Sequence, residues 1–394
     1  MLYKYKPFFI LLFIFAIRIG YSQHSSIYVE TLSMKQGLPN DITHYAIQDN
    51  KGFVWIATNY GFARFDGENV HTFATKNKEN SVVKCFQDVN GLIWAVLATG
   101  IDILNPLDNT SQTIQEHFGT LPFRLEKLKQ IINDSEGNIY LLLNNGDIYR
   151  YNGAFSKVAV FPYNRESDPP IELLTFIADE DCFWLSFRYY QSFLLYRLGF
   201  DGKIEAIRIP APVKKMQLSK KGQLWLLLGE DKASGDLYTF ENKSLKPVLL
   251  PGIIDIQNFI IDSDEQIWCV NQQQITVFNR KKQPLSRLSY NKLTTDAVKG
   301  AHLMVDGQNN VWFCTSVGIF IFHLQKVFFT NYLNQEQPFD TRGIYIDEAG
   351  NIFVNQESTY KISEKGVDTL APETRGVGLL KIGNKLLIGN YWDY

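Results

Sequence analysis

One short pattern recurs along almost the whole 394-residue chain. It is a turn that usually carries an aspartate and a glycine, followed by a strand-like run that contains an aromatic residue, as in DNKGFVW at residues 49–55. Weaker copies begin at residues 88, 134, 179, 219, 262, 306, 347 and, most weakly, 383. The repeated aromatic positions are Trp55, Trp94, Tyr140, Trp184, Trp225, Trp268, Trp312 and Phe353. Six of the seven tryptophans therefore occupy one position of a repeat.

The spacing of these copies predicts the fold. Including Leu387 of the last copy, the steps are 39, 46, 44, 41, 43, 44, 41 and 34 residues. A period of about 40 to 45 residues, with short strands separated by turns, is typical of a β-propeller with one four-stranded blade per repeat. The first copy shows four β-prone runs at 43–48, 53–58, 62–65 and 70–73, separated by Asx and glycine turns. We predict an all-β propeller in which the repeated aromatic residue packs between blades.

The number of copies suggests how the chain is divided. Single propellers usually have four to eight blades, so nine copies exceed one ring. Seven copies would fill a ring over residues 23–330, and residues 331–394 would form the first one or two blades of a second propeller. The second ring has too few strands to close, so we expect the chain to be a truncated fragment of a longer protein.

Residues 1–22 predict a signal peptide. Lys4 and Lys6 precede an apolar run at 8–17, and small or polar residues follow it. Ten apolar residues are too few to cross a bilayer as a helix, which needs about 20. The alternatives are a signal anchor or an N-terminal core helix. We expect an exported protein in the periplasm or another extracytoplasmic compartment.

Composition narrows the range of partners. The 39 basic and 41 acidic residues give a net charge of −2, which offers no general reason to expect binding to nucleic acid or an anionic membrane. The four cysteines are far apart, and each lies in or beside an apolar run, so we expect them to be free and buried. We expect no metal or other cofactor, because cysteines and histidines form no ligand cluster in the sequence.

The first repeat resembles a known family. Residues Gly37, Leu38, Pro39, Asp49, Gly52, Trp55, Thr58, Gly61, Asp66 and Gly67 match in order the two-component regulator propeller repeat, with Phe62 in place of the usual leucine. The second, third and seventh copies keep part of the pattern, and the others keep little of its glycine half. The resemblance implies the periplasmic sensor region of a hybrid two-component histidine kinase of the Bacteroidetes type, and many such sensors respond to polysaccharide breakdown products. It also implies partners in the full-length protein, namely its kinase domain and a second copy in a homodimer.

The repeated glycine and aspartate residues are better explained by a structural role in turns than by a catalytic or binding role. The glycines fall between strands and are not followed by a helix, unlike those of phosphate-binding loops. One aspartate per repeat before a turn is typical of an Asx turn, although a ring of carboxylates for catalysis or calcium is the alternative. The six histidines share no repeat position and show no metal-ligand spacing. We therefore predict no catalytic residue, and no kinase motif is present.

Ligand contacts are expected where the repeats differ, in loops on one face of the ring. Tyr189 and Tyr190 could stack on a sugar, and Gln191, Asn271 and Gln272 could bind its hydroxyl groups; each is equally explained as a solvated turn residue. The predicted function is recognition of a carbohydrate or another small molecule by a non-enzymatic sensor. The alternatives are a propeller-type lyase or hydrolase acting on glycans, and a non-signalling scaffold or gene fragment.

Overall fold

The computed structural model describes residues 25–76, 81–134, 136–161, 172–230 and 235–326, and, nearer the C-terminus, 343–347, 350–355, 358–363, 366–372, 376–382 and 385–390. The predicted signal peptide lies outside these residues. The chain forms two compact units, Met1–Lys326 and Val327–Tyr394. No helix among the described residues is long and apolar enough to cross a membrane.

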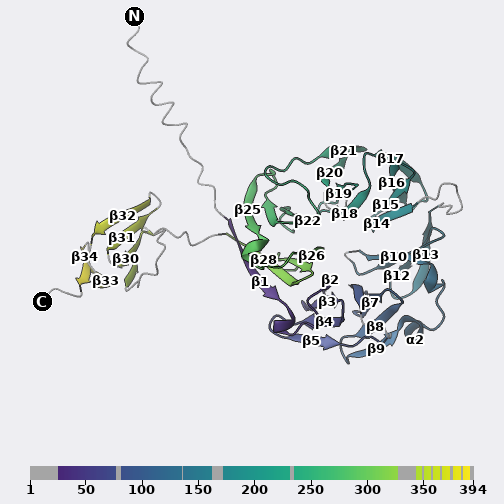
Figure 1. The fold of residues 1–394 in the computed structure, drawn as a ribbon, viewed down its shortest axis with the longest axis horizontal. Coiled ribbons are helices and arrows are strands. Elements are labelled where there is room, and N and C mark those ends of the chain that lie inside the picture. Colours follow the sequence, from purple (N-terminus) through teal and green to yellow (C-terminus); the bar gives the residue numbers. More distant parts are fainter. Residues whose placement is uncertain are drawn as a thin grey trace, which may run out of the picture. The chain divides into compact units, whose positions relative to one another are not determined.

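The described part of the first unit contains seven four-stranded antiparallel sheets arranged in a ring (Figure 1), so the predicted all-β propeller is confirmed. Blade 1 comprises β2 (Thr43–Gln48), β3 (Val54–Thr58), β4 (Gly61–Phe65) and β5 (Val70–Phe73). Blade 2 comprises β6 (Val82–Gln87), β7 (Ile93–Leu97), β8 (Ile101–Asn105) and β9 (Thr110–Thr113). Blade 3 comprises β10 (Leu128–Asn133), β11 (Ile139–Leu143), β12 (Asp147–Tyr151) and β13 (Phe155–Val160). Blade 4 comprises β14 (Glu172–Ala178), β15 (Cys182–Tyr189), β16 (Ser192–Gly199) and β17 (Ile204–Ile209).

The remaining blades follow the same order from the centre of the ring outward. Blade 5 comprises β18 (Val213–Leu218), β19 (Leu224–Leu228), β20 (Asp236–Glu241) and β21 (Ser244–Pro247). Blade 6 comprises β22 (Asn258–Ile261), β23 (Ile267–Val270), β24 (Gln274–Phe278) and β25 (Pro284–Ser289). Blade 7 comprises β26 (Gly300–Val305), β27 (Val311–Thr315), β28 (Gly318–Lys326) and, as its outer strand, the N-terminal β1 (Ser25–Leu32). Short helices occupy connections: η1 (Met34–Gln36), α2 (Ile114–Phe118), η2 (Leu125–Lys127) and η3 (Tyr290–Lys292).

The ring is closed by strands from opposite ends of the first unit. Strand β1 pairs with β28 over its full length, from Ser25 opposite Lys326 to Leu32 opposite Ile319. The repeat does not reveal this strand, because β1 carries neither the repeated turn nor the aromatic position that follows it. At the next seam the Thr43 hydroxyl accepts a hydrogen bond from the Thr315 backbone amide at 2.8 Å. Blade 7 therefore contains the N-terminal strand β1 and is hydrogen-bonded to blade 1.

The core lies between neighbouring blades. Seven clusters of buried apolar side chains occupy the described part of the ring, one at each interface between two successive blades. The second strand of each blade is buried on both faces, as in β3 and β7. Trp55, Trp94 and Trp268 are fully buried. This confirms that the repeated aromatic residue is a packing element between blades.

The repeated aspartate has two structural roles. In blade 1, one carboxylate oxygen of Asp49 accepts hydrogen bonds from the Lys51 and Phe53 backbone amides, both at 2.9 Å, which makes the predicted Asx turn. The other oxygen accepts a 2.8 Å bond from the indole N–H of Trp55. The same carboxylate-to-ring bond recurs at five further repeats, at Asp88–Trp94, Asp134–Tyr140, Asp179–Trp184, Asp262–Trp268 and Asp306–Trp312. Each aspartate thus fixes its turn and pairs the buried polar atom of the neighbouring ring.

The described part of the second unit contains one four-stranded and one two-stranded antiparallel sheet. The first comprises β29 (Gly343–Ile346), β30 (Ile352–Asn355), β31 (Thr359–Ser363) and β32 (Gly366–Ala371), and the second comprises β33 (Gly376–Ile382) and β34 (Lys385–Asn390). That these sheets begin a second, truncated propeller stays a prediction.

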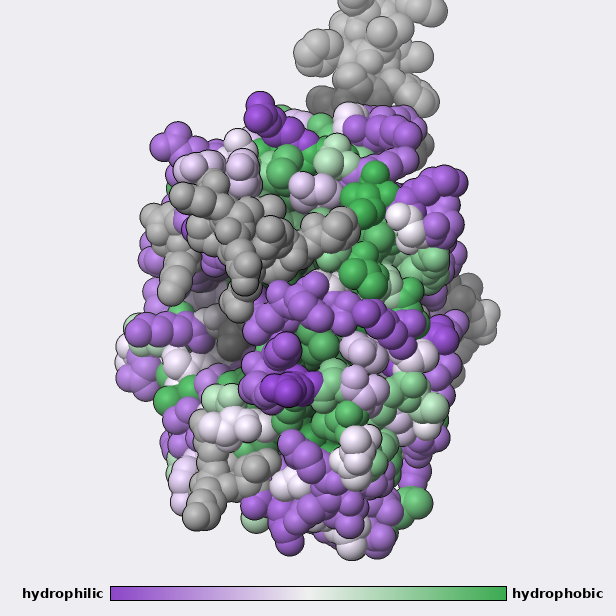
Figure 2. Space-filling view, turned by 90° about the vertical axis from the view of Figure 1, so that its right-hand side faces the viewer, coloured by the Kyte–Doolittle hydropathy of each residue, from purple (hydrophilic) through white to green (hydrophobic). Residues whose placement is uncertain are grey.

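The rim of the first unit has a mixed surface. On the side shown in Figure 2, hydrophobic residues lie among hydrophilic ones. Exposed apolar side chains on the outer parts of blades 3 and 4 include Val160, Phe200 and Ile204. Single apolar side chains of this kind are ordinary on soluble proteins and indicate no binding face.

The four cysteines, Cys85, Cys182, Cys269 and Cys314, are buried and free, as the sequence predicts.

Candidate functional site

The innermost strand of most blades begins with the same irregularity. Six of the seven inner strands have a register shift within their first four residues, as between Thr43 and Tyr45 in β2 and between Val213 and Lys215 in β18. A β-bulge re-aims the side chains that follow it and often lies near a functional site. Repeated around the ring, the bulge places the next residue of each blade at one common height.

One polar side chain per blade occupies this height, and together they form a polar ring. Each member pairs with the residue two positions after the repeated aromatic, as Tyr45 does with Ala57 and His302 with Cys314. All members are half-buried. The members are Tyr45, Lys84, Gln130, Thr175, Lys215, Asn258 and His302.

The polarity is confined to this layer. Two residues further along the inner strands, the same side of each strand carries Ile47, Phe86, Ile132, Ile177, Gln217, Ile260 and Met304. Six of these seven residues are apolar. Because side chains two apart on a strand face the same way, the polar ring rests on a mainly apolar layer. Figure 1 shows the inner strands β2, β10, β18, β22 and β26 nearest the centre of the propeller.

Members of the polar ring interact across blade boundaries. The Lys215 ammonium donates to the Asn258 amide oxygen at 2.8 Å and to the Phe259 carbonyl at 2.7 Å. The Tyr45 and His302 rings are stacked, with centroids 3.7 Å apart. Lys84 and Lys215 have no carboxylate partner among the described residues. The layer therefore holds two lysines without a compensating acid.

Burial shifts the pKa of several members of this ring. It lowers the pKa of Lys215 to about 7 and also lowers the pKa of Lys84. The pKa of His302 is well below its usual value, first because of burial and then because of the positive charges of Lys215 and Lys84. A backbone hydrogen bond with Ala46 acts in the opposite direction. With its pKa lowered in this way, His302 is neutral at pH 7.

A cleft leads to this ring between blades 2 and 3. Its volume is about 650 Å³, within the range typical of small-molecule sites. Lys84 and Gln130 of the polar ring line it, together with Lys129 and Thr99. The connection that carries α2 and η2 adds Gln115 to its wall. The insertion between β9 and β10 thus builds a blade-specific entrance to a layer that all blades share.

The residues predicted as ligand contacts lie on the face where the inner strands begin. Tyr189, Tyr190 and Gln191 form the β15–β16 hairpin of blade 4, and Asn271 and Gln272 lie in the β23–β24 turn of blade 6. The tyrosine rings meet edge to face at 5.3 Å, and Tyr190 is 65% exposed.

Asn271 has a clear structural role. Its side-chain oxygen accepts from the Gln273 and Gln274 backbone amides at 2.9 and 3.0 Å, and its amide nitrogen donates to the Ile254 carbonyl at 3.2 Å. These bonds fix the turn, which agrees with the alternative that Asn271 is a turn residue. A role of the five residues in ligand binding stays a prediction. The structure places them in blades 4 and 6, away from the cleft between blades 2 and 3.

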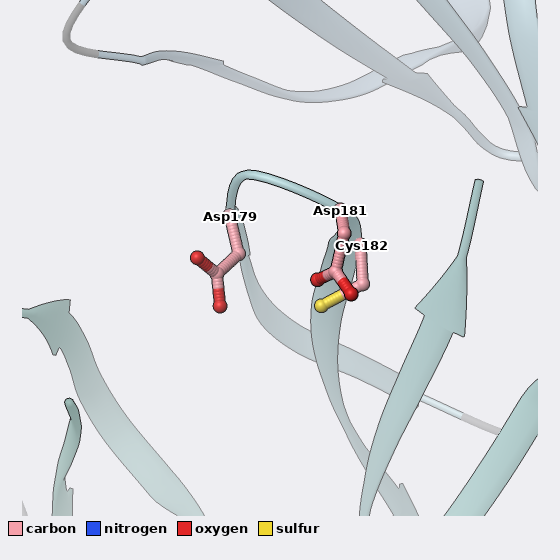
Figure 3. A group of neighbouring side chains, drawn as sticks. All are labelled: Asp179, Asp181 and Cys182. Carbon is pink, nitrogen blue, oxygen red and sulfur yellow. The ribbon is translucent and has the colours of Figure 1, made fainter. Parts of the chain in front are cut away.

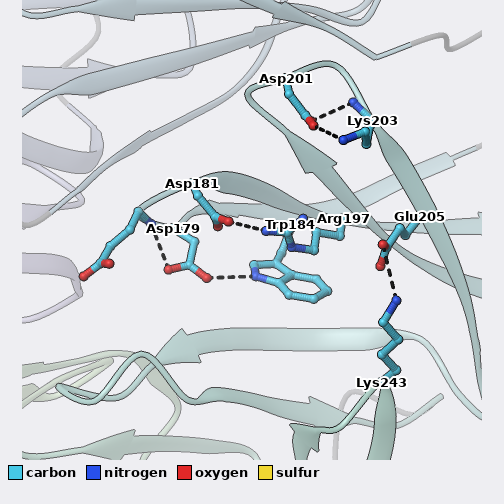
Figure 4. A network of polar contacts seen from close by, with 9 residues as sticks. Asp179, Asp181, Trp184, Arg197, Asp201, Lys203, Glu205 and Lys243 are labelled. Carbon is cyan, nitrogen blue, oxygen red and sulfur yellow. Dashed lines mark hydrogen bonds and ion pairs between the residues drawn. The ribbon is translucent and has the colours of Figure 1, made fainter.

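A small acidic cluster in blade 4 is better explained as a turn than as a metal site (Figure 3). Asp179 accepts from the Trp184 indole at 3.1 Å, and Asp181 is paired with Arg197 (Figure 4). Burial raises the pKa of the Cys182 thiol to about 12, which keeps it protonated at neutral pH. Metal ligation needs the thiolate. Both carboxylates also have partners within the protein.

Comparisons with known proteins support the fold. No protein-family model matches the chain, and no curated protein matches its sequence significantly. Similar solved structures include the extracellular domain of BT3049 from B. thetaiotaomicron, assigned to a hybrid two-component system, with a TM-score of 0.59 and 15% identity over 93% of this chain and 52% of that one. The corresponding domain of BT4673 from the same bacterium has a TM-score of 0.57 and 13% identity over 93% and 51% of the two chains.

An enzyme shares the fold as well. The virginiamycin B lyase of Staphylococcus aureus, solved with quinupristin, has a TM-score of 0.57 and 16% identity over 76% of this chain and 100% of that one. The chain spans about half the length of the two B. thetaiotaomicron structures. At such identities the likeness shows the β-propeller fold. The neighbours nevertheless include extracellular domains of the class that the first repeat resembles.

Proposed function

We propose that the first unit is the ligand-recognition propeller of an extracytoplasmic sensor that belongs to a two-component regulatory system. The observation that carries this proposal is the polar ring, which opens into a cleft of about 650 Å³ between blades 2 and 3. The ring members are half-buried polar side chains at one height on a rigid scaffold, and two of them, Lys84 and Gln130, also line the cleft, so the layer is available to bind a ligand. The resemblance of the first repeat and the sensor-type structural neighbours support the regulatory context.

A carbohydrate is the proposed ligand class. The ring and cleft offer hydroxyl, amide and ammonium groups, including Thr99, Gln115 and Gln130, and such groups bind sugar hydroxyls. Tyr45 and His302 add a stacked aromatic pair at the same height. Signalling would require the ligand to bind one arrangement of the full-length sensor better than another. A kinase domain and a second copy of the chain are the proposed partners in that step.

The second candidate function is a propeller lyase. It is favoured by Lys215, because a pKa of about 7 would let this amine accept a proton at neutral pH, as a general base must. One protein of similar fold, the virginiamycin B lyase, is an enzyme of the lyase class.

One experiment separates the two candidates. The exported chain is screened by thermal shift against mono- and oligosaccharides, and each stabilising compound is then incubated with the protein and analysed by mass spectrometry. A ligand at 100 times its Kd should stabilise the fold by about 2.7 kcal/mol. Recovery of the ligand unchanged supports the sensor, and conversion to product supports the lyase. A screen in which nothing stabilises the protein contradicts the sensor proposal.

A further inference from the structure

The link between blades 2 and 3 is an insertion that supplies part of the cleft wall. Residues 114–127 form the longest connection between two successive blades of the ring and carry α2 and η2. Gln115 on α2 and Glu126 on η2 both line the cleft. Lys84 and Gln130 of the polar ring line it as well. The cleft therefore joins side chains of the polar ring to side chains of the insertion.

The start of the insertion is fixed by a capping box. The Glu116 backbone amide donates to the Thr113 hydroxyl at 3.2 Å, and the Thr113 backbone amide donates to the Glu116 carboxylate at 2.8 Å. Ile114, the first residue of α2, is fully buried in the apolar cluster between blades 2 and 3. These contacts define the backbone position of the next residue, Gln115.

The insertion also packs on aromatic rings from both blades. The ring centroid of Phe118, at the end of α2, lies 5.7 Å from that of Trp94 in blade 2. In blade 3 it lies 5.2 Å from Tyr151 and 5.1 Å from Phe155. Phe123, further along the insertion, lies 5.5 Å from Phe155. Because aromatic pairs add to the energy of area burial, this packing makes the wall a pre-organised surface across two blades.

The polar groups of this wall suit sugar hydroxyls. The Gln115 amide offers both donors and an acceptor, and the Glu126 carboxylate offers two acceptor oxygens. The Gln115 side chain is exposed and makes no hydrogen bond within the part of the chain that the structure describes. Glu126 lies 4.0 Å from Arg124, and both side chains are largely exposed, so this ion pair is weak. Both groups are thus available to a ligand in the cleft.

Resting on the proposed function, we infer that the insertion is the specificity element of the cleft. Gln115 and Glu126 bind hydroxyl groups of the saccharide, and Phe118 is a positioning residue that holds α2 in place. A rigid wall can pair a hydroxyl in one configuration, whereas the epimer leaves a polar group unpaired. Affinity is shared between the polar ring and the wall, but the choice between epimers depends on the wall.

Calorimetric titration of the purified protein with cellobiose and lactose tests this inference, because the two disaccharides differ in the configuration of one hydroxyl group. We expect one of them to bind at least about fivefold more tightly than the other. Gln115→Ala and Glu126→Ala should each weaken binding of the preferred sugar by about threefold to tenfold and bring the ratio of the two affinities toward one. Gln112→Ala is the matched control, because Gln112 is an exposed glutamine on β9 that does not line the cleft.

Phe118→Leu tests the positioning role. It removes the aromatic contacts that hold α2 and should lower the ratio of the two affinities without changing a residue that lines the cleft. A loss of stability alone would leave this ratio unchanged. Circular dichroism confirms that each variant is folded, and Phe118→Met replaces Phe118→Leu if that protein is unfolded.

The outcomes separate this inference from the proposed function. If the two disaccharides bind equally well, or if the wall variants keep the wild-type ratio, the insertion is not the specificity element while a saccharide sensor remains. If neither disaccharide binds, the inference is overturned, and the wider thermal-shift screen decides the proposed function.

Discussion

Ser219→Asp should stabilise the propeller, because blade 5 lacks the aspartate that pairs with the repeated tryptophan. The indole N–H of Trp225 is buried and has no hydrogen-bond partner among the described residues. Among the described residues, the Ser219 hydroxyl accepts a hydrogen bond only from the Lys221 backbone amide, at 3.3 Å. In blade 6 the equivalent Asp262 binds the Asp264 and Gln266 backbone amides and the Trp268 indole at 2.8–2.9 Å. The substitution should therefore add an indole bond and at least one turn bond.

The expected gain is small because the new carboxylate is also buried. Pairing a buried orphan donor is worth about 1–3 kcal/mol. Burial raises the pKa of Asp262, which shows that the charged form is penalised at this position. We expect a net gain of about 1 kcal/mol at pH 7, after roughly half of the hydrogen-bond energy is offset by desolvation.

Urea unfolding followed by tryptophan fluorescence measures this change. Asp262→Ser is the reciprocal control and should lower the free energy of unfolding by about 1–3 kcal/mol, because it leaves the Trp268 indole unpaired. An unchanged or lower stability of Ser219→Asp, together with wild-type stability of Asp262→Ser, would refute the assignment of the aspartate–tryptophan bond as a determinant of the fold.

Two further predictions concern ring closure and the channel. Gly318→Ala should destabilise the protein more than Gly67→Ala, measured by urea unfolding: both glycines have φ near +105°, but a Cβ at Gly318 would lie 2.6 Å from the Leu32 carbonyl of β1, whereas Gly67 has open space. An equal loss of unfolding free energy in the two variants would contradict the close approach of Gly318 to the Leu32 carbonyl of β1. Lys215→Met should flatten the pH dependence of stability. The lysine's pKa is about 7 when folded and about 10.4 when unfolded, so the unfolded state binds more protons between these values, and wild-type stability rises with pH by up to about 1.4 kcal/mol per unit. Lys84 and His302 also belong to the polar ring and have shifted pKa values, so the free energy of unfolding of the variant is compared with that of the wild type at each pH. Identical dependence on pH from 7 to 10 would show that Lys215 is not desolvated.

The sequence predicts the blades well because a single physical requirement recurs in each of them. Trp55 and its equivalents fill the same inter-blade space, and Asp49 and its equivalents make the same turn, so both leave a period that can be read directly. The strands 43–48 and 70–73 match β2 and β5, and the other two differ from β3 and β4 by one residue at their starts.

Ring closure could not be read from the repeat. Strand β1 pairs with β28, about 290 positions away in the chain, through backbone bonds that leave no side-chain pattern. The indole bond of the aspartates was also missed, although the constant six-residue spacing from Asp49 to Trp55 and from Asp88 to Trp94 could have suggested it.

The polar ring was missed because its members differ in chemistry. Tyr45, Lys84 and His302 resemble one another only in lying ten residues before the repeated aromatic. The sequence predicts ligand contacts in loops, where the repeats differ in length. The inner strands keep their length and vary in side chains, which is how a rigid ring presents different groups at one height.

Hydrogen–deuterium exchange of the purified protein, with and without a stabilising saccharide, tests the central claim most directly. The account predicts that protection appears around the cleft and polar ring, at residues 83–85, 97–101 and 125–131 and in the inner strand that carries Lys215. Protection confined to the loops at Tyr189–Gln191 and Asn271–Gln272, with no change in the inner strands, would contradict recognition in the channel and move the site to the loops.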